Sequence, residues 1–309
     1  MSYTEEKIKK LISKHINLNN DIIINSIGNH HIGRHLVYRI DNGKDKFVFK
    51  SYYRNDKRER ELNSLKILSD CRTRVPIIKD FGEYNNKQWI LMDYIEGEVF
   101  ENIYLTLNKE NILRLFYELG EALGKIHSYK TFDYALNWNK SIGINDFKEY
   151  KIKKFEERVI EIYEQKSPYK ELLIKGIKIV RKNYNSLFQK ENFRLTHNDF
   201  DGRNVLVKNE NGVYSIQAII DFEQSYPDDY CNDLANLYFK YFNGNKDYEK
   251  EFLKGYNRYI GVDKGFYKLL DKYLILMVIE HCSWSYERAN DYYMENIEFL
   301  EKLLNTYKN

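Results

Sequence analysis

The sequence has few cysteines, no excess of charge of either sign, and no internal repeat or low-complexity tract. Its three cysteines, Cys71, Cys231 and Cys282, are far apart and odd in number, which suits a reducing cytoplasm and not a disulfide framework. With 49 lysines and arginines against 46 aspartates and glutamates, the formal net charge is only +3. This balance argues against nucleic acid as a partner, because nucleic-acid-binding proteins usually carry a basic excess or stripe.

Long hydrophobic segments are also missing. The strongest apolar run, from Tyr273 to Ile279, is far too short to cross a bilayer, which takes about 20 residues. The N-terminus predicts an amphipathic helix with one apolar face, and not a signal peptide; that face holds Ile8, Leu11, Ile12 and Ile16. We therefore expect a cytoplasmic protein without a membrane partner. The abundance of Lys, Asn, Ile and Tyr fits an AT-rich bacterial genome.

The most informative segment is His197-Asn198-Asp199-Phe200-Asp201-Gly202-Arg203-Asn204. Its His-x-Asp-x-x-x-x-Asn spacing suits phosphoryl transfer, in which one carboxylate receives a hydroxyl proton while an amide and a second carboxylate hold Mg²⁺. We predict that Asp199 and His197 are the catalytic residues, with Asp199 taking the proton and His197 bracing the loop. Asn204 and Asp221 are the predicted Mg²⁺ ligands. The alternative is a plain polar turn, since Asp-Gly is a strong turn signal.

The residues that follow support the catalytic interpretation. Two extended runs, Val205–Val207 and Val213–Ile220, flank a turn that ends in Asn211-Gly212, and this pattern predicts a β-hairpin. A hairpin folds the chain back on itself. It would bring Asp221, which follows the second run, beside Asn204, as a shared metal site requires.

The upstream half contains a candidate phosphate-binding lysine. Phe47 to Lys50 predicts a strand, and the segment from Asp56 to Ser69 predicts a helix with leucines at helical spacing. Glu61 within that helix is the best partner for Lys50, with Glu59 as its rival on a different face. A strand lysine held by a helix glutamate is the device that aims an ammonium group at nucleotide phosphates. The alternatives are a solvated lysine and an exposed helix charge.

A loop between two extended segments precedes this strand. It runs from Ser26 to Gly33 and includes Gly28, which we predict to help cover the nucleotide phosphates with backbone N–H groups. The full Gly-x-Gly-x-x-Gly pattern is missing, so a plain hairpin loop is the alternative. His30, His31 and His35 fit no zinc-site spacing, and we expect them to be surface histidines.

The order of elements predicts an α+β fold with two lobes. Residues 1–95 alternate helix and strand patterns and form the expected nucleotide-binding lobe, with an antiparallel sheet and a hinge at Asp93, Tyr94 and Ile95. Residues 96–309 are mainly helical and contain the catalytic loop, the metal site and the substrate pocket. We expect the nucleotide to lie in the cleft between the two lobes.

With these motifs in place, the chain resembles the aminoglycoside phosphotransferase and choline kinase superfamily, small-molecule kinases with a protein-kinase-like fold. The resemblance covers most of the chain and follows the family's order. It rests on Lys50 with Glu61, the hinge Trp89–Gly97, the helix ending Leu-Gly-Lys-Ile-His at His127, the loop His197–Asn204, Ile219-Ile220-Asp221-Phe222-Glu223, and Asp233-Leu234-Ala235. It implies an ATP- or GTP-dependent, Mg²⁺-requiring phosphotransferase with an alcohol acceptor.

Two departures refine this expectation. The metal segment is Asp-Phe-Glu where protein kinases have Asp-Phe-Gly, and neither a long activation loop nor an Ala-Pro-Glu signature follows it. These differences favour a small-molecule kinase over a protein kinase. The incomplete glycine pattern leaves the phosphate-covering loop less well defined.

The acceptor is the least determined feature. A polycationic aminoglycoside needs carboxylates, whereas a quaternary ammonium group needs an aromatic cage. We favour an aminoglycoside, as in antibiotic resistance, and predict substrate contacts from Glu223, Asp228, Asp229, Glu280, Trp284 and Glu287. The alternatives for these residues are a solvated helix face and ordinary aromatic packing.

Other functions remain open at this stage. The acceptor of the same fold can instead be choline, ethanolamine, a sugar or another metabolite. A catalytically inactive binding module is a further alternative, although the presence of Lys50, Glu61, Asp199, Asn204 and Asp221 argues against it. We expect a monomer.

Overall fold

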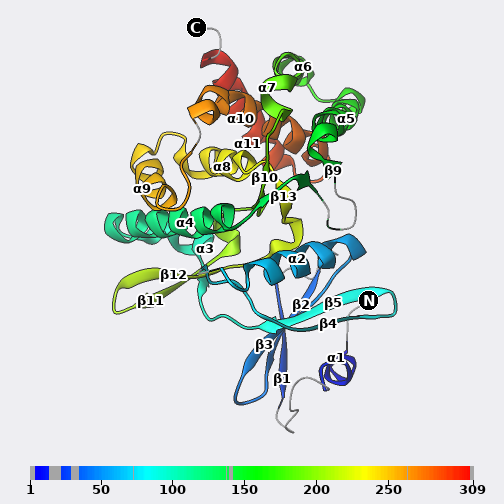
Figure 1. Cartoon of the computed structure of the whole chain (residues 1–309), viewed down its shortest axis with the longest axis vertical. Coiled ribbons are helices and arrows are strands. Elements are labelled where there is room, and N and C mark those ends of the chain that lie inside the picture. Colours follow the sequence, from blue (N-terminus) through cyan, green and yellow to red (C-terminus); the bar gives the residue numbers. More distant parts are fainter. Residues whose placement is uncertain are drawn as a thin grey trace.

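The computed structural model describes residues 4–13, 22–28, 35–71, 73–136, 138, 142–262 and 264–306. A five-stranded antiparallel sheet dominates its N-terminal part and helices dominate the rest, which confirms the predicted α+β architecture (Figure 1). Ile16, His30, His31 and the loop residues 29–33 lie outside the described ranges. Within those ranges, no helix has both the length and the apolar character needed to cross a membrane.

The sheet positions the predicted lysine. Its strands lie in the order β1 (Ile23–Ile27), β2 (Leu36–Asp41), β3 (Lys46–Ser51), β5 (Lys87–Asp93) and β4 (Ile78–Tyr84). Because successive strand residues point to opposite faces, Phe49 packs into the cluster under α1 (Glu5–Ile12), while Lys50 faces α2 (Asn55–Leu68).

The helical part surrounds several short strands. Its helices are α3 (Phe100–Ile103), α4 (Lys109–Tyr129), α5 (Ile144–Glu164), α6 (Lys170–Lys182), α7 (Tyr184–Phe188), α8 (Cys231–Leu237), α9 (Lys246–Tyr256), α10 (Lys264–Ser285) and α11 (Asn290–Thr306). A π-helical turn, η5 (Tyr238–Phe242), follows α8, and η2 (Tyr104–Thr106), η3 (Gly202–Asn204) and η4 (Phe222–Gln224) are 3₁₀ turns. The short strands are β6 (Glu98–Val99), β7 (Thr131–Phe132), β8 (Tyr134–Ala135), β9 (Ile142–Gly143), β10 (Phe193–Thr196) and β13 (Tyr226–Asp228).

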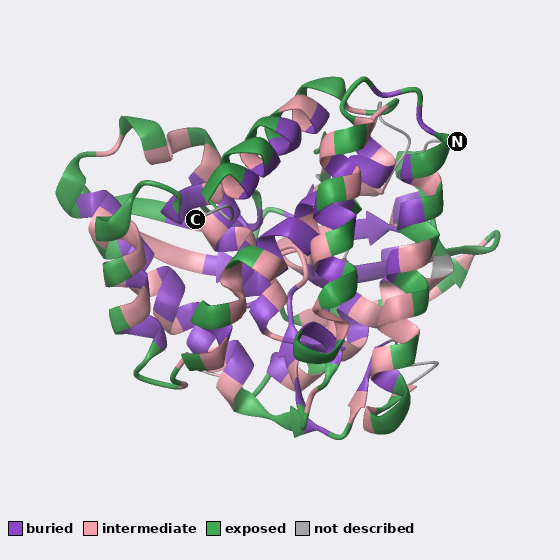
Figure 2. Ribbon diagram, turned by 90° about the horizontal axis from the view of Figure 1, so that it is seen from above, coloured by how far each residue is buried: buried purple, intermediate pink, exposed green. Residues whose placement is uncertain are grey.

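Helix α4 shows how sequence pattern and burial agree. Asn108 caps its N-terminus, because the side chain accepts a hydrogen bond from the amide of Asn111 at 2.9 Å. The apolar positions predicted for its inner face are all buried, namely Ile112, Leu115, Phe116, Leu119, Leu123 and Ile126. Seen from above, the helices of this part carry buried stripes on one side and exposed residues on the other (Figure 2).

Two glycines allow α4 and α9 to approach closely. A Cβ atom on Gly120 would lie 2.0 Å from the carbonyl oxygen of Phe252, and one on Gly255 would lie 2.0 Å from the carbonyl oxygen of Tyr117. Both neighbours are helix backbone, which cannot move aside as a flexible side chain would. The two helices therefore pack against each other only because both positions lack a side chain.

We expect Gly120→Ala to lower the free energy of unfolding by about 1–3 kcal/mol, because the added methyl group would push α9 away from α4. Gly261→Ala is the matched control, since a Cβ atom added there would have no neighbour within 4 Å among the described residues. Thermal unfolding of both variants tests this packing. Equal melting temperatures would contradict it.

The predicted catalytic hairpin is present. Strands β11 (Val205–Glu210) and β12 (Val213–Ile219) pair in antiparallel fashion, and Asn211 and Gly212 between them have φ values of +56° and +86°. Such angles are typical of a tight hairpin turn. The amide of Ile220 donates to the carbonyl oxygen of Asn204 at 2.9 Å, so the residue before Asp221 is bonded directly to Asn204.

Candidate active site

The catalytic loop is anchored at its start by Asp233 of α8. This buried carboxylate accepts hydrogen bonds from the amides of His197 and Asn198, each at 2.7 Å, and contacts Nε2 of His127 at 3.1 Å. Charged acceptors make strong hydrogen bonds, particularly away from water. Both Asp233 and His127 belonged to the sequence motifs, but their role as anchors of the loop was not predicted.

His197 lies inside the protein, where it cannot contact a substrate. Its ring is fully buried between Phe200 and Phe222, with centroid distances of 5.8 and 4.6 Å. Nε2 lies 3.0 Å from the carbonyl oxygen of Ile220, which is the residue before Asp221. The imidazole therefore joins the catalytic loop to the metal segment, in keeping with the predicted bracing role.

Asp199 is the carboxylate of the loop that is open to solvent, with a side chain 39 % exposed. Arg203 Nη2 and Asn204 Nδ2 each lie 3.3 Å from one of its oxygens. Although the group is partly exposed, the surrounding protein displaces enough water to raise its pKa to about 6, with Asp201 adding to the shift and Arg203 opposing it. The carboxylate is thus mainly ionised at neutral pH yet more basic than usual, as a general base requires.

Arg203 is a residue of the site that sequence reasoning did not single out. The buried carboxylate of Asp201 accepts from its backbone amide at 2.8 Å and from its guanidinium, with Nη2 at 2.5 Å. This clamp holds the guanidinium beside Asp199 while leaving the side chain 60 % exposed. The Asp-Gly-Arg turn in the motif was the one signal that could have found it, because an aspartate bonded to an amide two residues on is a common turn device.

Asn204 and Asp221 provide oxygen atoms suited to Mg²⁺. The Nδ2 of Asn204 donates to the carbonyl oxygen of Asp199 at 2.8 Å, which leaves the amide oxygen of that side chain for a cation. Asp221 has left-handed backbone angles, φ +65° and ψ +59°, and such a conformation is uncommon outside glycine and clusters at functional sites. Its carboxylate is 36 % exposed. An amide oxygen and a carboxylate are ligands that Mg²⁺ prefers.

Lys50 makes the predicted contact with Glu61. Its buried ammonium group lies 2.7 Å from Glu61 Oε2 and 2.6 Å from Asp221 Oδ1, and the Tyr52 hydroxyl also donates to Glu61. Burial alone would lower the pKa of Lys50, but the carboxylates of Asp221 and Glu61 raise it above its ordinary value. The lysine is therefore a permanent cation beside the metal segment. The rival Glu59 instead contacts Arg58.

Glu223 lies close to basic side chains of the N-terminal part. It contacts His35 and lies 3.5 Å from Lys50 Nζ and 3.9 Å from the buried Nζ of Lys57. Burial would raise the pKa of Glu223, but the contact with His35 and the charge of Lys50 lower it to about 2. The geometry therefore does not support its predicted contact with a cationic substrate. Burial also lowers the pKa of Lys57 to about 8.

His35 is not a surface histidine, so that prediction is wrong. Its side chain is only 10 % exposed, and its ring packs edge-on against Tyr52 and Tyr53 with centroids 5.0 and 4.9 Å away. Pairing of β2 with β3 places His35, just before β2, against the two tyrosines that follow β3. This neighbourhood involves residues far apart in the sequence, which explains why histidine spacing alone did not reveal it.

Asp228 and Asp229 are satisfied by lysines of the same chain. Asp228 is 1 % exposed and lies 3.0 Å from Lys151 Nζ, while Asp229 is 5 % exposed and lies 2.6 Å from Lys190 Nζ. The Tyr273 hydroxyl also donates to Asp229 at 2.7 Å. Buried and paired in this way, the two carboxylates hold the fold together, and the geometry weighs against their predicted role as substrate ligands.

The remaining predicted substrate residues lie on and just after α10. Glu280 and Glu287 are exposed, and Trp284 packs against Tyr292 of α11 with ring centroids 5.6 Å apart. The Tyr292 hydroxyl lies 2.9 Å from Nδ1 of His281. Burial raises the pKa of Tyr292, and the hydrogen bond with Asn296 opposes this effect.

The hinge has one backbone donor to offer. The carboxylate of Asp93 accepts from the amide of Ile77, and the amide of Tyr94 donates to the carbonyl oxygen of Lys46 at 3.0 Å. Among the described residues, no group accepts a hydrogen bond from the backbone N–H of Ile95. Ile95 itself is a buried residue. Gly28 directly follows β1 and has a φ of +77°, and the loop residues 29–33 lie outside the described ranges.

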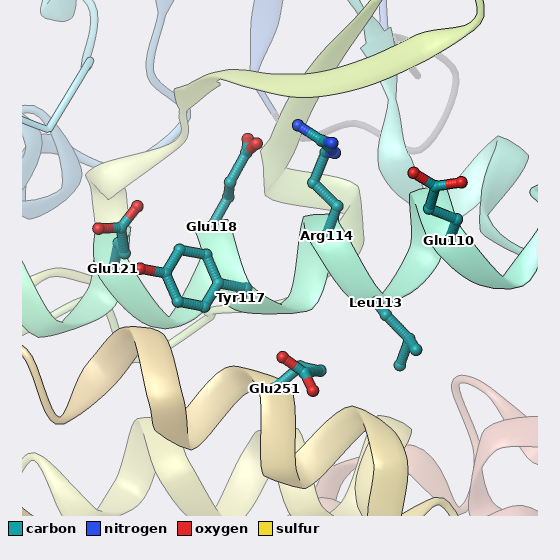
Figure 3. Close-up of a pocket in the computed structure, with 7 residues that line it drawn as sticks. All are labelled: Glu110, Leu113, Arg114, Tyr117, Glu118, Glu121 and Glu251. Atoms are coloured by element: carbon teal, nitrogen blue, oxygen red, sulfur yellow. The ribbon is translucent and has the colours of Figure 1, made fainter.

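A groove of about 360 Å³ lies elsewhere, between α4 and α9 (Figure 3). Acidic residues line much of it, and they include Glu110, Glu118, Glu121 and Glu251. Glu118 accepts from the amide of Ile216, while Glu121 and Glu251 pair with Arg258 and Lys254. None of the predicted site residues lines the groove, and the carboxylates of Glu118, Glu121 and Glu251 have structural partners.

Comparison with known proteins agrees with this geometry. The sequence profile of the phosphotransferase enzyme family matches residues 32–270. Aminoglycoside phosphotransferase APH(4)-Ia has a similar structure, with a TM-score of 0.72 at 16 % identity over 98 % of this chain and 99 % of that one. Spectinomycin phosphotransferase APH(9)-Ia, in complex with ADP and spectinomycin, has a TM-score of 0.62 at 18 % identity over 98 % of this chain and 95 % of that one.

A third similar structure is ADP-bound APH(2'')-Ib, with a TM-score of 0.63 at 20 % identity over 97 % of this chain and 98 % of that one. No protein of curated function matches the sequence. At these identities the structural likeness establishes the fold, while the profile match spans most of the chain. The chain therefore belongs to the phosphotransferase enzyme family.

Proposed function

We propose that this protein transfers the terminal phosphoryl group of ATP or GTP to a hydroxyl of a small molecule. The observation that carries the proposal is a pair of contact sets joined by the backbone. Glu61 holds Lys50 and Lys50 contacts Asp221, while Asn204 contacts Asp199. The amide of Ile220, the residue before Asp221, donates to the carbonyl oxygen of Asn204 and joins the two sets. These contacts bring together the cation of Lys50, two side chains with oxygen atoms suited to a metal, and the carboxylate of Asp199, whose pKa is raised. Phosphoryl transfer relies mainly on such positioning and charge stabilisation.

The residues divide the reaction between them. Asp199 accepts the proton of the acceptor hydroxyl while the oxygen of that hydroxyl attacks the γ-phosphorus. The bond between the γ-phosphorus and the β–γ bridging oxygen breaks, which releases the nucleoside diphosphate. Asn204 and Asp221 would hold Mg²⁺, which would neutralise charge on the phosphates. Lys50 contributes a further positive charge, and Arg203 is placed beside the base to stabilise charge near the reacting oxygen.

The nucleotide would lie along the edge where the sheet meets the helical part. Residues 1–95 would form its lobe and residues 96–309 the acceptor lobe, with the N–H of Ile95 able to donate to the base. Backbone donors do not separate ATP from GTP. We also retain the expectations of a cytoplasmic location and a monomer.

An aminoglycoside is our first candidate for the acceptor. Its support is the fold shared with enzymes named for these antibiotics, including a complex with hygromycin B. Glu280 and Glu287 are exposed and available to a cationic ligand. Glu223, Asp228 and Asp229, by contrast, are occupied by cations of the protein.

The second candidate is a small amino alcohol such as choline or ethanolamine. The observation that favours it is the pairing of Trp284 with Tyr292, because aromatic faces attract ammonium groups without needing carboxylates. Lys240 already lies over the Tyr292 ring at 5.6 Å, so the indole of Trp284 is the better candidate face.

The test is release of nucleoside diphosphate by purified protein with Mg²⁺ and ATP or GTP, across aminoglycosides, choline, ethanolamine and simple sugars. Stimulation by one aminoglycoside class supports the first acceptor, and stimulation only by an amino alcohol supports the second. A folded protein that binds nucleotide but phosphorylates nothing in the panel would count against both.

Lys50→Met should lower kcat/KM for the nucleotide by about 10²-fold, since it removes a fixed charge aimed at the phosphates. Lys44→Met is the matched control, because Lys44 is exposed on the turn before the same strand. Thermal unfolding must accompany the assay, as the change leaves Glu61 without its cation. A Lys50→Met protein that is folded and fully active would exclude the assigned role.

A further inference from the structure

A single helix contacts the backbone of the catalytic loop at several points. Asp233 accepts from the amides of His197 and Asn198, and Asn236 Nδ2 donates to the carbonyl oxygen of Phe200 at 2.9 Å. Further along, the hydroxyl of Tyr241 accepts from the amide of Gly202 at 2.8 Å. The loop is thus held at its start, middle and end by side chains of α8 and η5.

The π-helical turn explains how Tyr241 reaches the loop. In an uninterrupted α-helix, a residue eight positions after Asp233 would lie about 80° round the axis from it. The helix instead widens at η5, where the amide of Asn243 donates to the carbonyl oxygen of Tyr238, five residues back, at 3.1 Å. The wider turn rotates Tyr241 back toward the loop. Such turns recur at functional sites.

Tyr241 is held in turn by Glu101. Its hydroxyl donates to Glu101 Oε2 at 2.5 Å while accepting from Gly202, so both hydrogen-bonding capacities of the group are used. The tyrosine is 4 % exposed. Burial and the Glu101 carboxylate raise its pKa, which keeps the hydroxyl protonated as this arrangement needs.

Glu101 links this contact to the strand pair that follows the catalytic loop. It lies on α3, directly after β6, and β6 pairs with β11 just beyond Asn204. A Cβ atom on Gly202 would lie 2.5 Å from the Tyr241 hydroxyl and 2.7 Å from Glu101 Oε2. The glycine of the Asp-Gly-Arg turn is therefore required by this close approach, and the three residues form one packed unit.

We propose that Tyr241, held by Glu101, is a positioning residue that fixes the end of the catalytic loop. By bonding the Gly202 amide it sets the turn that carries Arg203 beside Asp199 and presents the amide oxygen of Asn204 to the metal. The catalytic consequence rests on the proposed function. The contact itself does not, and it can be measured separately.

The first test is hydrogen–deuterium exchange in the full-length protein. Tyr241→Phe should speed exchange in peptides covering residues 198–204 by about tenfold, because the Gly202 amide loses its acceptor. Tyr238→Phe is the matched control: it removes a hydroxyl that bonds Glu249 from the same π-helical turn. Unchanged exchange in Tyr241→Phe, or equal changes in both variants, would overturn the proposal.

The second test measures turnover against Mg²⁺ concentration. Tyr241→Phe should lower kcat between about tenfold and a hundredfold and raise the Mg²⁺ concentration for half-maximal rate, with little change in the acceptor KM. Glu101→Gln keeps an oxygen for the Tyr241 hydroxyl and should be nearly normal, whereas Glu101→Leu should resemble Tyr241→Phe. A Tyr241→Phe protein with normal Mg²⁺ dependence would refute the positioning role.

The two tests separate the possible failures. If the unaltered protein shows no phosphoryl transfer, the proposed function is wrong, and the exchange experiment still decides whether Tyr241 fixes the loop. If turnover is present but exchange near Gly202 is unaffected by Tyr241→Phe, the positioning role alone is wrong.

Discussion

Asp199→Asn is expected to lower kcat by about 10²–10⁴ while leaving the nucleotide KM nearly unchanged. The amide keeps the size of the side chain and can still face Arg203 and Asn204, but it cannot accept a proton from the acceptor hydroxyl. Steady-state kinetics with a substrate identified in the panel measures the loss. Retention of more than about a tenth of the rate would mean that Asp199 is not the base.

The pH dependence provides a second signature of the same group. Because burial raises the pKa of Asp199 to about 6, kcat/KM of the unaltered protein should fall about tenfold per unit as the pH drops below that value. The residual activity of Asp199→Asn should lack this decline. An acidic limb that persists in the variant would assign the titration to another group.

Thermal unfolding distinguishes lost chemistry from lost structure. A folded-state pKa raised above its unfolded value means that the stability contribution of Asp199 is present at low pH and is lost as the pH rises through about 6. At neutral pH the ionised carboxylate also faces Asp201 and Asp221. We therefore expect Asp199→Asn to unfold at the same temperature as the unaltered protein or slightly above it.

Lys190→Met is expected to lower the free energy of unfolding by about 3–5 kcal/mol at neutral pH, the largest stability effect we foresee. The change removes the cation that lies 2.6 Å from Asp229 and leaves a buried carboxylate with only neutral partners. Chemical denaturation measures the loss. Lys175→Met on an exposed face of α6 is the control and should have little effect.

The loss of stability in Lys190→Met should depend on pH, in a direction set by the pKa of Asp229. Burial would raise the pKa of Asp229, but Lys190 and the hydrogen bonds of the group lower it below its ordinary value. Its contribution is therefore present above the unfolded pKa of about 3.9 and is lost as the pH falls through the lower folded value. In Lys190→Met the lysine no longer opposes the effect of burial on the pKa of Asp229, so acid protonates this carboxylate more readily and the difference in stability between the two proteins narrows.

A double variant tests whether the charge itself is responsible. Lys190→Met with Asp229→Asn removes both charges. The asparagine keeps an oxygen for the amide of Cys231, and its NH₂ group can donate to the Tyr273 hydroxyl, so the double variant should recover much of the lost stability. A double variant as unstable as Lys190→Met would show that packing around the lysine stem, and not an unpaired charge, causes the loss.

Local pattern was enough to predict the elements that carry the chemistry. The spacing of His197, Asp199 and Asn204 indicated the loop, and the Asn211-Gly212 turn predicted the hairpin that returns the chain to Asp221. The contact between Lys50 and Glu61 was also foreseen, because a strand lysine and a helix glutamate each belong to a regular element whose facing side follows from periodicity.

The partners of the buried charges followed no such pattern. Asp228 and Asp229 were expected to face a cationic substrate because they follow the metal segment closely. They instead meet Lys151 and Lys190, which come from α5 and from the segment before β10. Which cation reaches a carboxylate depends on how separate elements pack, and the sequence of each element is compatible with several packings.

The same distinction applies to the catalytic loop. By itself the sequence determined the fold class and singled out the candidate base and metal ligands, since these depend on short-range spacing and alternation. Only the tertiary structure decided what holds them in place, namely Asp233 at the start of the loop and Tyr241 with Glu101 at its end. Those contacts join residues distant in sequence, and Tyr241 lies in a single turn of helix that is wider than its neighbours.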